Sequence, residues 1–176
     1  MLTDAYKPII FISYAREDGP EGKAGWLPFV YSFLDPGIKD QAFIVWTDLL
    51  IRGGEDWDLK IERKLRDCDI FIVLVSRYST SSDYILDKEV AIIRDRQSKM
   101  EDVHFYPILL TSTPKAGLKK VHDKNLRPRG LKPLRKFSTY RREEEMCEIA
   151  NELEDIANDI SRKRTFEVAV EEKEVR

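Results

Sequence analysis

The sequence contains little cysteine and no long apolar run. Its two cysteines, Cys68 and Cys147, lie far apart in the chain, and neither belongs to a CxxC pair, so we expect neither a disulfide framework nor a zinc site. No apolar run approaches the ~18 residues that a membrane-spanning helix requires. The first residues carry neither the basic start nor the apolar core of a secretion signal. We therefore expect a cytoplasmic protein that does not enter a membrane.

The common signatures of nucleotide and hydrolase sites are also missing. The chain has no GxGxxG, no GxxxxGKS/T and no GxSxG motif, which argues against a Rossmann dinucleotide site, a P-loop and an α/β-hydrolase nucleophile. Of its two histidines, His104 stands inside an apparent strand and His122 inside a basic segment. Neither lies beside an obvious serine or cysteine nucleophile, so we do not expect a hydrolase triad.

Charged residues are abundant and unevenly distributed. They make up 35% of the 176 residues and hydrophobic ones 42%, a composition typical of one globular domain. Residues 115–142 hold eleven Lys/Arg and one acid, Asp123, whereas acids dominate from Glu143 onward. A basic strip can bind nucleic acid, but no aromatic residues alternate with these cations as a stacking platform requires. We therefore do not expect nucleic acid as a partner.

Short apolar runs that end in polar or turn residues predict four strands buried on both faces. The runs are residues 9–12, 42–46, 69–76 and 103–110. A weak fifth strand is expected at residues 131–137, where Pro133 would confine it to an edge of the sheet.

Helical patterns alternate with these runs, at residues 26–34, 55–68, 85–97 and 142–160. In the second of them one apolar stripe is formed by Trp57, Ile61, Leu65 and Cys68. Alternating strands and helices predict an α/β fold in which helices cover both faces of a parallel sheet. Residues 164–176 are charged and lack a sustained pattern. We expect them to form a fraying tail or the start of a linker, with 166–170 compatible with a short strand.

Polar residues follow the first two predicted strands directly. Residues 13–18 come after the first strand, and Asp48 closes the second. Ligands of open parallel sheets bind at the carboxyl edge of the strands, so these residues are candidates for the wall of a site. The alternative is an ordinary loop and a strand-ending turn residue.

One carboxylate of the third predicted helix faces inward. At about 100° per residue, Glu89 falls in the apolar arc that contains Ile85, Ile92 and Ile93. An inward carboxylate is costly unless it is paired, protonated or open to a wet cleft. Two interpretations stay open, a buried ion pair with Arg96 two turns on and a functional carboxylate.

Three segments together resemble the TIR (Toll/interleukin-1 receptor) domain, and more closely its bacterial branch. They are "IFISYAREDG" (10–19), "VWTDLLIRGGEDWDLKI" (45–61) and "CDIFIVLVSRYSTSSDYILDKEV" (68–90). The resemblance gives a domain at residues 7–163. It implies a flavodoxin-like three-layer sandwich with a five-stranded parallel sheet.

The resemblance also implies an activity. Glu89 matches the glutamate with which enzymatic TIR domains cleave NAD between nicotinamide and ribose. The matching wall of the cleft uses Ser13, Tyr14, Ala15 and Arg16, with Asp48 on the same rim and Tyr14 or Tyr84 packing against a flat ring. NAD is then a substrate, the product is ADP-ribose or a cyclic form, neither a cofactor nor a metal is needed, and the setting is bacterial antiphage defence.

The chain departs from this family at one position. Enzymatic members often place a tryptophan four residues before the glutamate, where this chain has Ile85. Tyr84 stands five residues before Glu89, an offset that would turn its ring away from the carboxylate on a continuous α-helix. The offset would not matter if Tyr84 preceded the helix. The alternative function is therefore a non-enzymatic TIR module that acts by association.

The loop after the second strand is unusually apolar. Leu49, Leu50 and Ile51 are consecutive and are followed by Arg52 and two glycines. An apolar loop of this kind is most often a partner surface, although the residues can also fold back onto the core. In TIR domains the matching loop contacts a neighbouring protomer and gates the cleft. We therefore expect other TIR protomers as partners.

Overall fold

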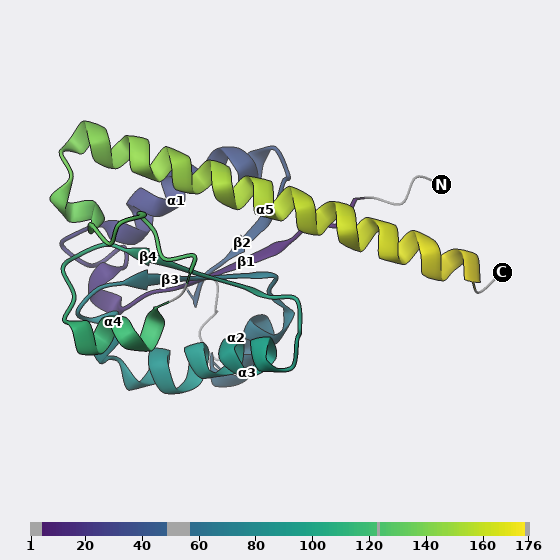
Figure 1. Ribbon diagram of the computed structural model, residues 1–176, viewed down its shortest axis with the longest axis horizontal. Coiled ribbons are helices and arrows are strands. Elements are labelled where there is room, and N and C mark those ends of the chain that lie inside the picture. The colour runs from purple at the N-terminus through teal and green to yellow at the C-terminus, as the bar shows by residue number, and fades with distance from the viewer. Residues whose placement is uncertain (1–4, 49–56, 123, 175–176) are drawn as a thin grey trace.

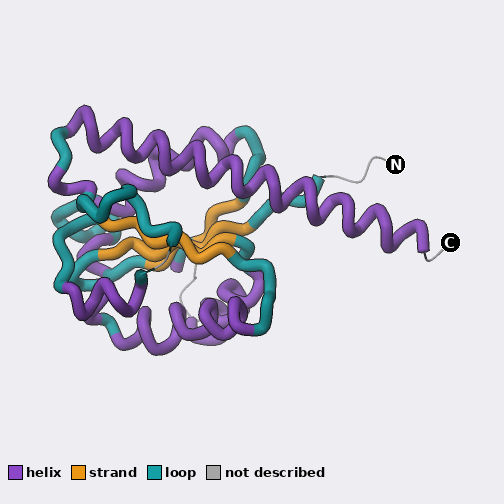
Figure 2. The backbone as a smooth tube through the Cα atoms, viewed as in Figure 1, coloured by secondary structure: helices purple, strands orange, loops and turns teal. Residues whose placement is uncertain are grey.

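The computed structural model describes residues 5–48, 57–122 and 124–174. In this part of the chain a sheet of parallel strands runs through the centre (Figures 1 and 2) in the order β2-β1-β3-β4. The strands are β1 (Ile9–Ser13), β2 (Ile44–Trp46), β3 (Ile70–Val75) and β4 (His104–Leu109). All four strands were predicted from the apolar runs, and the order agrees with that of flavodoxin-like folds.

The predicted fifth strand was wrong, because the sheet in the described residues has four strands. Residues 134–136 form a 3-10 turn directly after Pro133. The edge of β4 is covered by irregular chain instead, where the Arg127 amide donates to the Pro107 carbonyl and the Leu109 amide to the Arg127 carbonyl. The next residue, Pro128, has no N–H with which to continue this ladder. The contact therefore stops at a single bridge between Ile108 and Arg127.

Helices cover both faces of the sheet and complete three layers (Figure 1). One face carries α1 (Trp26–Lys39) and α5 (Thr139–Glu174). The other face carries α2 (Trp57–Asp67), α3 (Ala91–Ser98) and α4 (Lys115–Val121), with a π-helical segment, Tyr84–Val90, leading into α3. The predicted α/β fold with a covered parallel sheet is confirmed. No helix within the described residues is both long and apolar enough to cross a membrane.

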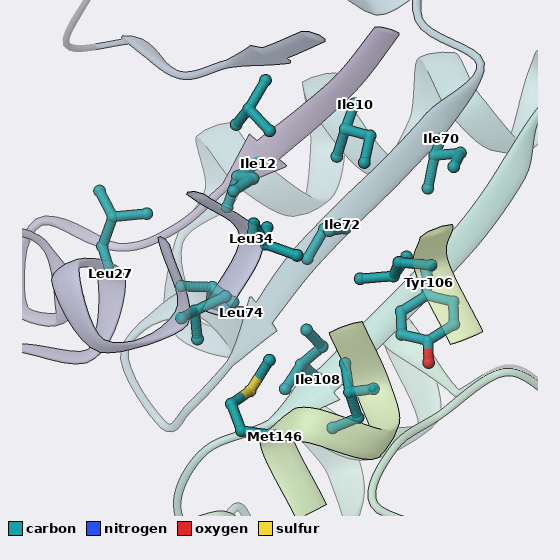
Figure 3. Close-up of a cluster of buried hydrophobic side chains, with 14 of the residues drawn as sticks. Ile10, Ile12, Leu27, Leu34, Ile70, Ile72, Leu74, Tyr106, Ile108 and Met146 are labelled. Atoms are coloured by element: carbon teal, nitrogen blue, oxygen red, sulfur yellow. The ribbon is translucent and has the colours of Figure 1, made fainter. Parts of the chain in front are cut away.

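The position of β3 between β1 and β4 explains why its sequence is apolar without interruption. All six residues are buried, because successive side chains point to opposite faces and both faces are covered. Ile70, Ile72 and Leu74 join the core under α1 and α5 (Figure 3). Phe71, Val73 and Val75 join the second core, under α2 and α3. The side chains of this strand therefore pack in both hydrophobic cores. Its carboxyl end lies at the edge of the sheet where the candidate site is found.

Helix α2 has the predicted apolar stripe. Ile61, Leu65 and Cys68 at its end are fully buried. The helix begins at Trp57, whose side chain lies outside the described residues. Residues 49–56 lie outside them too, and so does the predicted assembly loop.

Helix α5 is longer than predicted. It continues to Glu174, so the expectation of a short strand at residues 166–170 was wrong, whereas a tail or the start of a linker after residue 163 stays a prediction. The N-terminal segment packs along this extension: the Tyr6 amide donates to Thr165 Oγ1 at 3.1 Å, and Ser161 Oγ donates to the Tyr6 carbonyl at 2.5 Å. These contacts support a helical turn that carries no apolar stripe of its own.

Candidate functional site

A cleft of about 840 Å³ lies at the carboxyl edge of the sheet. Its walls come from the loop after β1, from the end of β2, from the loop after β3 and from the π-helical segment. Six of the seven predicted site residues line it: Tyr14, Ala15, Arg16, Asp48, Tyr84 and Glu89. The seventh, Ser13, lies next to the cleft as the hydrogen-bond partner of Glu89.

Glu89 is buried, with 6% of its surface exposed. Ser13 Oγ donates a hydrogen bond to Glu89 Oε2 and fixes the carboxyl group against the end of β1. Burial raises the pKa of Glu89 to about 7, and nearby Asp48 adds to the rise, while the Ser13 hydrogen bond and Lys88 oppose it. Glu89 therefore gains and loses its proton near neutral pH.

The alternative of a buried ion pair between Glu89 and Arg96 was wrong. Arg96 is buried, but its guanidinium donates to the carbonyls of Leu65 and Cys68 at 2.7 and 2.8 Å and to Glu101 at 2.8 Å. It thereby binds the C-terminal end of α2. The carboxyl group of Glu89 borders the cleft instead.

Tyr84 reaches the cleft because the helix that follows it is not an α-helix. Residues 84–90 are π-helical, and i→i+5 hydrogen bonding brings residues five apart to neighbouring turns of one face. Tyr84 and Glu89, five residues apart, accordingly line the same cleft, and the α-helical offset expected from the sequence does not apply. Lys88 lies 5.2 Å from the centre of the Tyr84 ring and pairs with Asp58 at 3.2 Å.

Tyr14 and Asp48 join two walls of the cleft. The Tyr14 hydroxyl donates to Asp48 Oδ1. Burial of the ring, and then this hydrogen bond, raise the pKa of Tyr14 well above its usual value, so Tyr14 stays a neutral donor. The pair ties the loop after β1 to the end of β2.

A second polar pair joins the loops after β1 and β3. Ser76 Oγ donates to Asp18 Oδ2 at 2.5 Å and accepts hydrogen bonds from the amides of Tyr78 and Ser79. Asp18 is 1% exposed, and burial raises its pKa. This pair holds the walls rather than lining the cleft.

The sequence reasoning missed Arg77 and Tyr78, which also line the cleft. Arg77 lies over the Tyr78 ring at 4.7 Å and donates to its hydroxyl at 2.7 Å. Both residues lie in the loop after β3, so the carboxyl-edge rule that selected the residues after β1 and β2 would have found them. Within the described residues no cluster of His, Cys, Asp and Glu could hold a metal ion.

Comparison with known proteins gives one family. A family model described as "TIR domain" matches residues 10–141, more than half of the chain. No curated protein matches this sequence. Among solved structures, the chain is similar to the TIR domains in "Structure of the activated Roq1 resistosome directly recognizing the pathogen effector XopQ", with 16% identity, a TM-score of 0.48, and coverage of 82% of this chain and 84% of that one. So weak a superposition adds nothing to the family match.

Proposed function

The chain belongs to the TIR domain family, and from this premise we propose that it is an NAD glycohydrolase of bacterial antiphage defence. The reaction cleaves NAD between nicotinamide and ribose and gives ADP-ribose or a cyclic form of it. The observation that carries the proposal is Glu89, a carboxyl group buried among apolar residues and open on one side to a cleft. A buried carboxylate is expensive to maintain, and a charge that develops in the cleft during a reaction would give it a use.

The chemistry needs a fixed negative charge at one point. As the bond between nicotinamide and ribose breaks, positive charge builds on the ribose, and an oriented carboxylate stabilises it. Nicotinamide leaves as a neutral molecule, so no strong acid is required. Water adds to the ribose carbon and releases its proton, which balances NAD⁺ plus water against ADP-ribose, nicotinamide and H⁺. In the cyclic product a nucleophile of the adenine takes the place of water.

Other residues of the cleft have roles that suit this substrate. Arg16 is exposed and faces Glu21 across 3.7 Å, a solvent-screened pair that leaves its guanidinium able to bind a pyrophosphate. The rings of Tyr14 and Tyr84 offer surfaces for the flat nicotinamide. Ser13 orients the carboxylate of Glu89.

The proposal is tested by release of nicotinamide from NAD, measured by chromatography over a range of protein concentrations. Glu89→Gln should lower the rate by about 10²-fold or more, because it removes the negative charge that stabilises the transition state and hardly changes the volume of the side chain. Glu148→Gln is the matched control, since Glu148 is exposed on α5, away from the cleft. Circular dichroism and thermal unfolding show whether each variant is folded.

Two results would decide against the proposal. If folded Glu89→Gln protein released nicotinamide at the rate of the parent, Glu89 would not be the catalytic residue. If the parent released none at any concentration, the chain would be a TIR module that acts by association alone.

A further inference from the structure

A second cleft, of about 1000 Å³, adjoins the first one. It lies on the α1 and α5 side of the same edge of the sheet, between the loop after β1, the start of α1, the residues after β4 and the start of α5. Five residues line both clefts: Arg16, Glu17, Glu21, Arg77 and Tyr78. The two clefts therefore share a border, and one elongated ligand can occupy both.

The second cleft is rich in cations. Its lining contains five of them, Arg16, Lys23, Arg77, Arg135 and Arg142, against the three carboxyl groups of Glu17, Asp18 and Glu21. Asp18 is turned to Ser76 and Glu21 faces Arg16. Lys23 and Arg135 are exposed, and neither forms an ion pair within the described part of the chain. The cleft thus has an excess of positive charge with no partner.

Donors without partners lie in the same place. Trp26 lines the cleft and is 5% exposed, and its indole Nε1 is the one buried side-chain polar atom without a hydrogen bond among the described residues. Helix α1 begins here with Gly25 as its cap, without a side-chain cap and without an acid in its first turn. Free amides at a helix N-terminus attract anions. Thr111 and Ser112 add two hydroxyl groups.

We propose that the second cleft binds a nucleoside diphosphate, namely the ADP half of the dinucleotide whose nicotinamide end lies at Glu89. This inference rests on the proposed function for the identity of the dinucleotide. The pyrophosphate crosses the border at Arg16 and Arg77, whose planar guanidinium groups suit phosphate oxygens. The ring of Tyr78, which is 39% exposed, offers a stacking surface at the same border. Lys23 and Arg135 then attract the phosphate of the adenylate half from the far side.

The first test is ADP binding, measured by isothermal titration calorimetry. The double variant Lys23→Glu/Arg135→Glu changes residues that line only the second cleft, and it should weaken ADP binding by about tenfold or more, equivalent to ~1.4 kcal/mol. The control Lys119→Glu/Lys120→Glu makes the same change of charge on exposed residues of α4 and should bind like the parent. Equal affinity of all three proteins would overturn the inference, as would a parent that does not bind ADP.

The second test compares NAD with nicotinamide mononucleotide, which lacks the adenylate. The double variant should raise KM for NAD about tenfold with kcat nearly unchanged, and should leave KM for the mononucleotide as in the parent. A KM that rises equally for both substrates would contradict an ADP site. ADP binding requires no bond cleavage, so failure of the ADP site and failure of the glycohydrolase are seen in separate measurements.

Discussion

At the scale of the residue, the pair of Ser13 and Glu89 joins the end of β1 to the helical segment on the opposite wall. Burial raises the pKa of Glu89 and the Ser13 hydrogen bond lowers it, and the effect of burial is the larger one. Ionisation of this carboxyl group therefore costs folding free energy, whereas the proposed reaction requires the ionised form. Stability and activity should respond to pH in opposite senses.

Stability should fall as Glu89 loses its proton. Its pKa in the folded protein, about 7, lies above its ordinary value of 4.5, so the protonated group favours folding fully below the ordinary pKa and this contribution is lost as pH rises through about 7. The shift corresponds to roughly 3 kcal/mol. Urea unfolding should show Glu89→Gln gaining about that much on the parent between about pH 4 and pH 8. A difference independent of pH would place the pKa of Glu89 at its ordinary value.

Ser13→Ala should move the pH profile of nicotinamide release. The Ser13 hydrogen bond lowers the pKa of Glu89, so its loss raises that pKa, and the ionised carboxylate forms at higher pH. The acid limb of kcat/KM should shift upward, while activity well above the new pKa is largely retained. Ser32→Ala, on the exposed face of α1, is the control. A uniform loss of activity with an unmoved limb would mean that Ser13 has only a structural role.

At the scale of the element, the π-helical segment decides which side chain shares a face with Glu89. An α-helix would have presented Ile85 beside it, four residues earlier. With i→i+5 hydrogen bonding, Tyr84 takes the position next to Glu89 on the same face. Ile85 also lines the cleft and is 5% exposed. The aromatic surface of the site is thus supplied by a change of helix type.

Tyr84→Ala should raise KM for NAD about tenfold, because stacking of a base on an aromatic ring contributes ~1–3 kcal/mol. Tyr84→Phe keeps the ring and should behave almost as the parent, which separates stacking from the hydrogen bond between the Tyr84 hydroxyl and Asp58. Tyr31→Ala, on the exposed surface of α1, is a control for loss of an aromatic residue. An unchanged KM in Tyr84→Ala would exclude the ring from substrate binding.

The elements also differ in how far their sequences predict them. Strands such as β3 are predictable because burial on both faces requires an unbroken apolar run. The π-helical turn was not predictable, because its residues show an ordinary helical pattern and the extra residue per turn leaves no mark in apolar spacing. The continuation of α5 through Thr165 was missed because a contact that supports this turn comes from Tyr6, far away in the sequence.

The site divides in the same way. Asp48 and the residues after β1 could be predicted, since position after a parallel strand is a local property. Glu89 was found from its place among apolar residues, but its relation to Arg96 was left open and only the fold resolved it. Arg135 lines the second cleft because of how the whole chain packs, and no local sequence pattern predicts this position.

At the scale of the whole molecule, self-association remains a prediction from the sequence. Leu50→Asp should lower both association and specific activity without unfolding the domain, because a charge in an apolar contact is expensive to desolvate. Light scattering and NAD turnover over a dilution series measure the two effects. Leu131→Asp is the matched control at a described, exposed position.

The outcome that would contradict this prediction is simple to recognise. Folded Leu50→Asp protein that associates and turns over NAD like the parent at every concentration would remove residues 49–52 from the assembly surface. Equal loss in Leu131→Asp would point to a general effect of added charge.

The course of α5 leads the described chain away from the two clefts. The helix starts beside the second cleft, where Arg142 lines it, and runs back across the sheet to meet Tyr6 at the opposite edge. The first and last described residues, Ala5 and Glu174, both lie on that far side (Figure 1). A purification handle, a fluorophore or a solid support can therefore be attached at either end while the clefts stay open to solution. Tethered single molecules would then report ligand binding without obstruction by the tether.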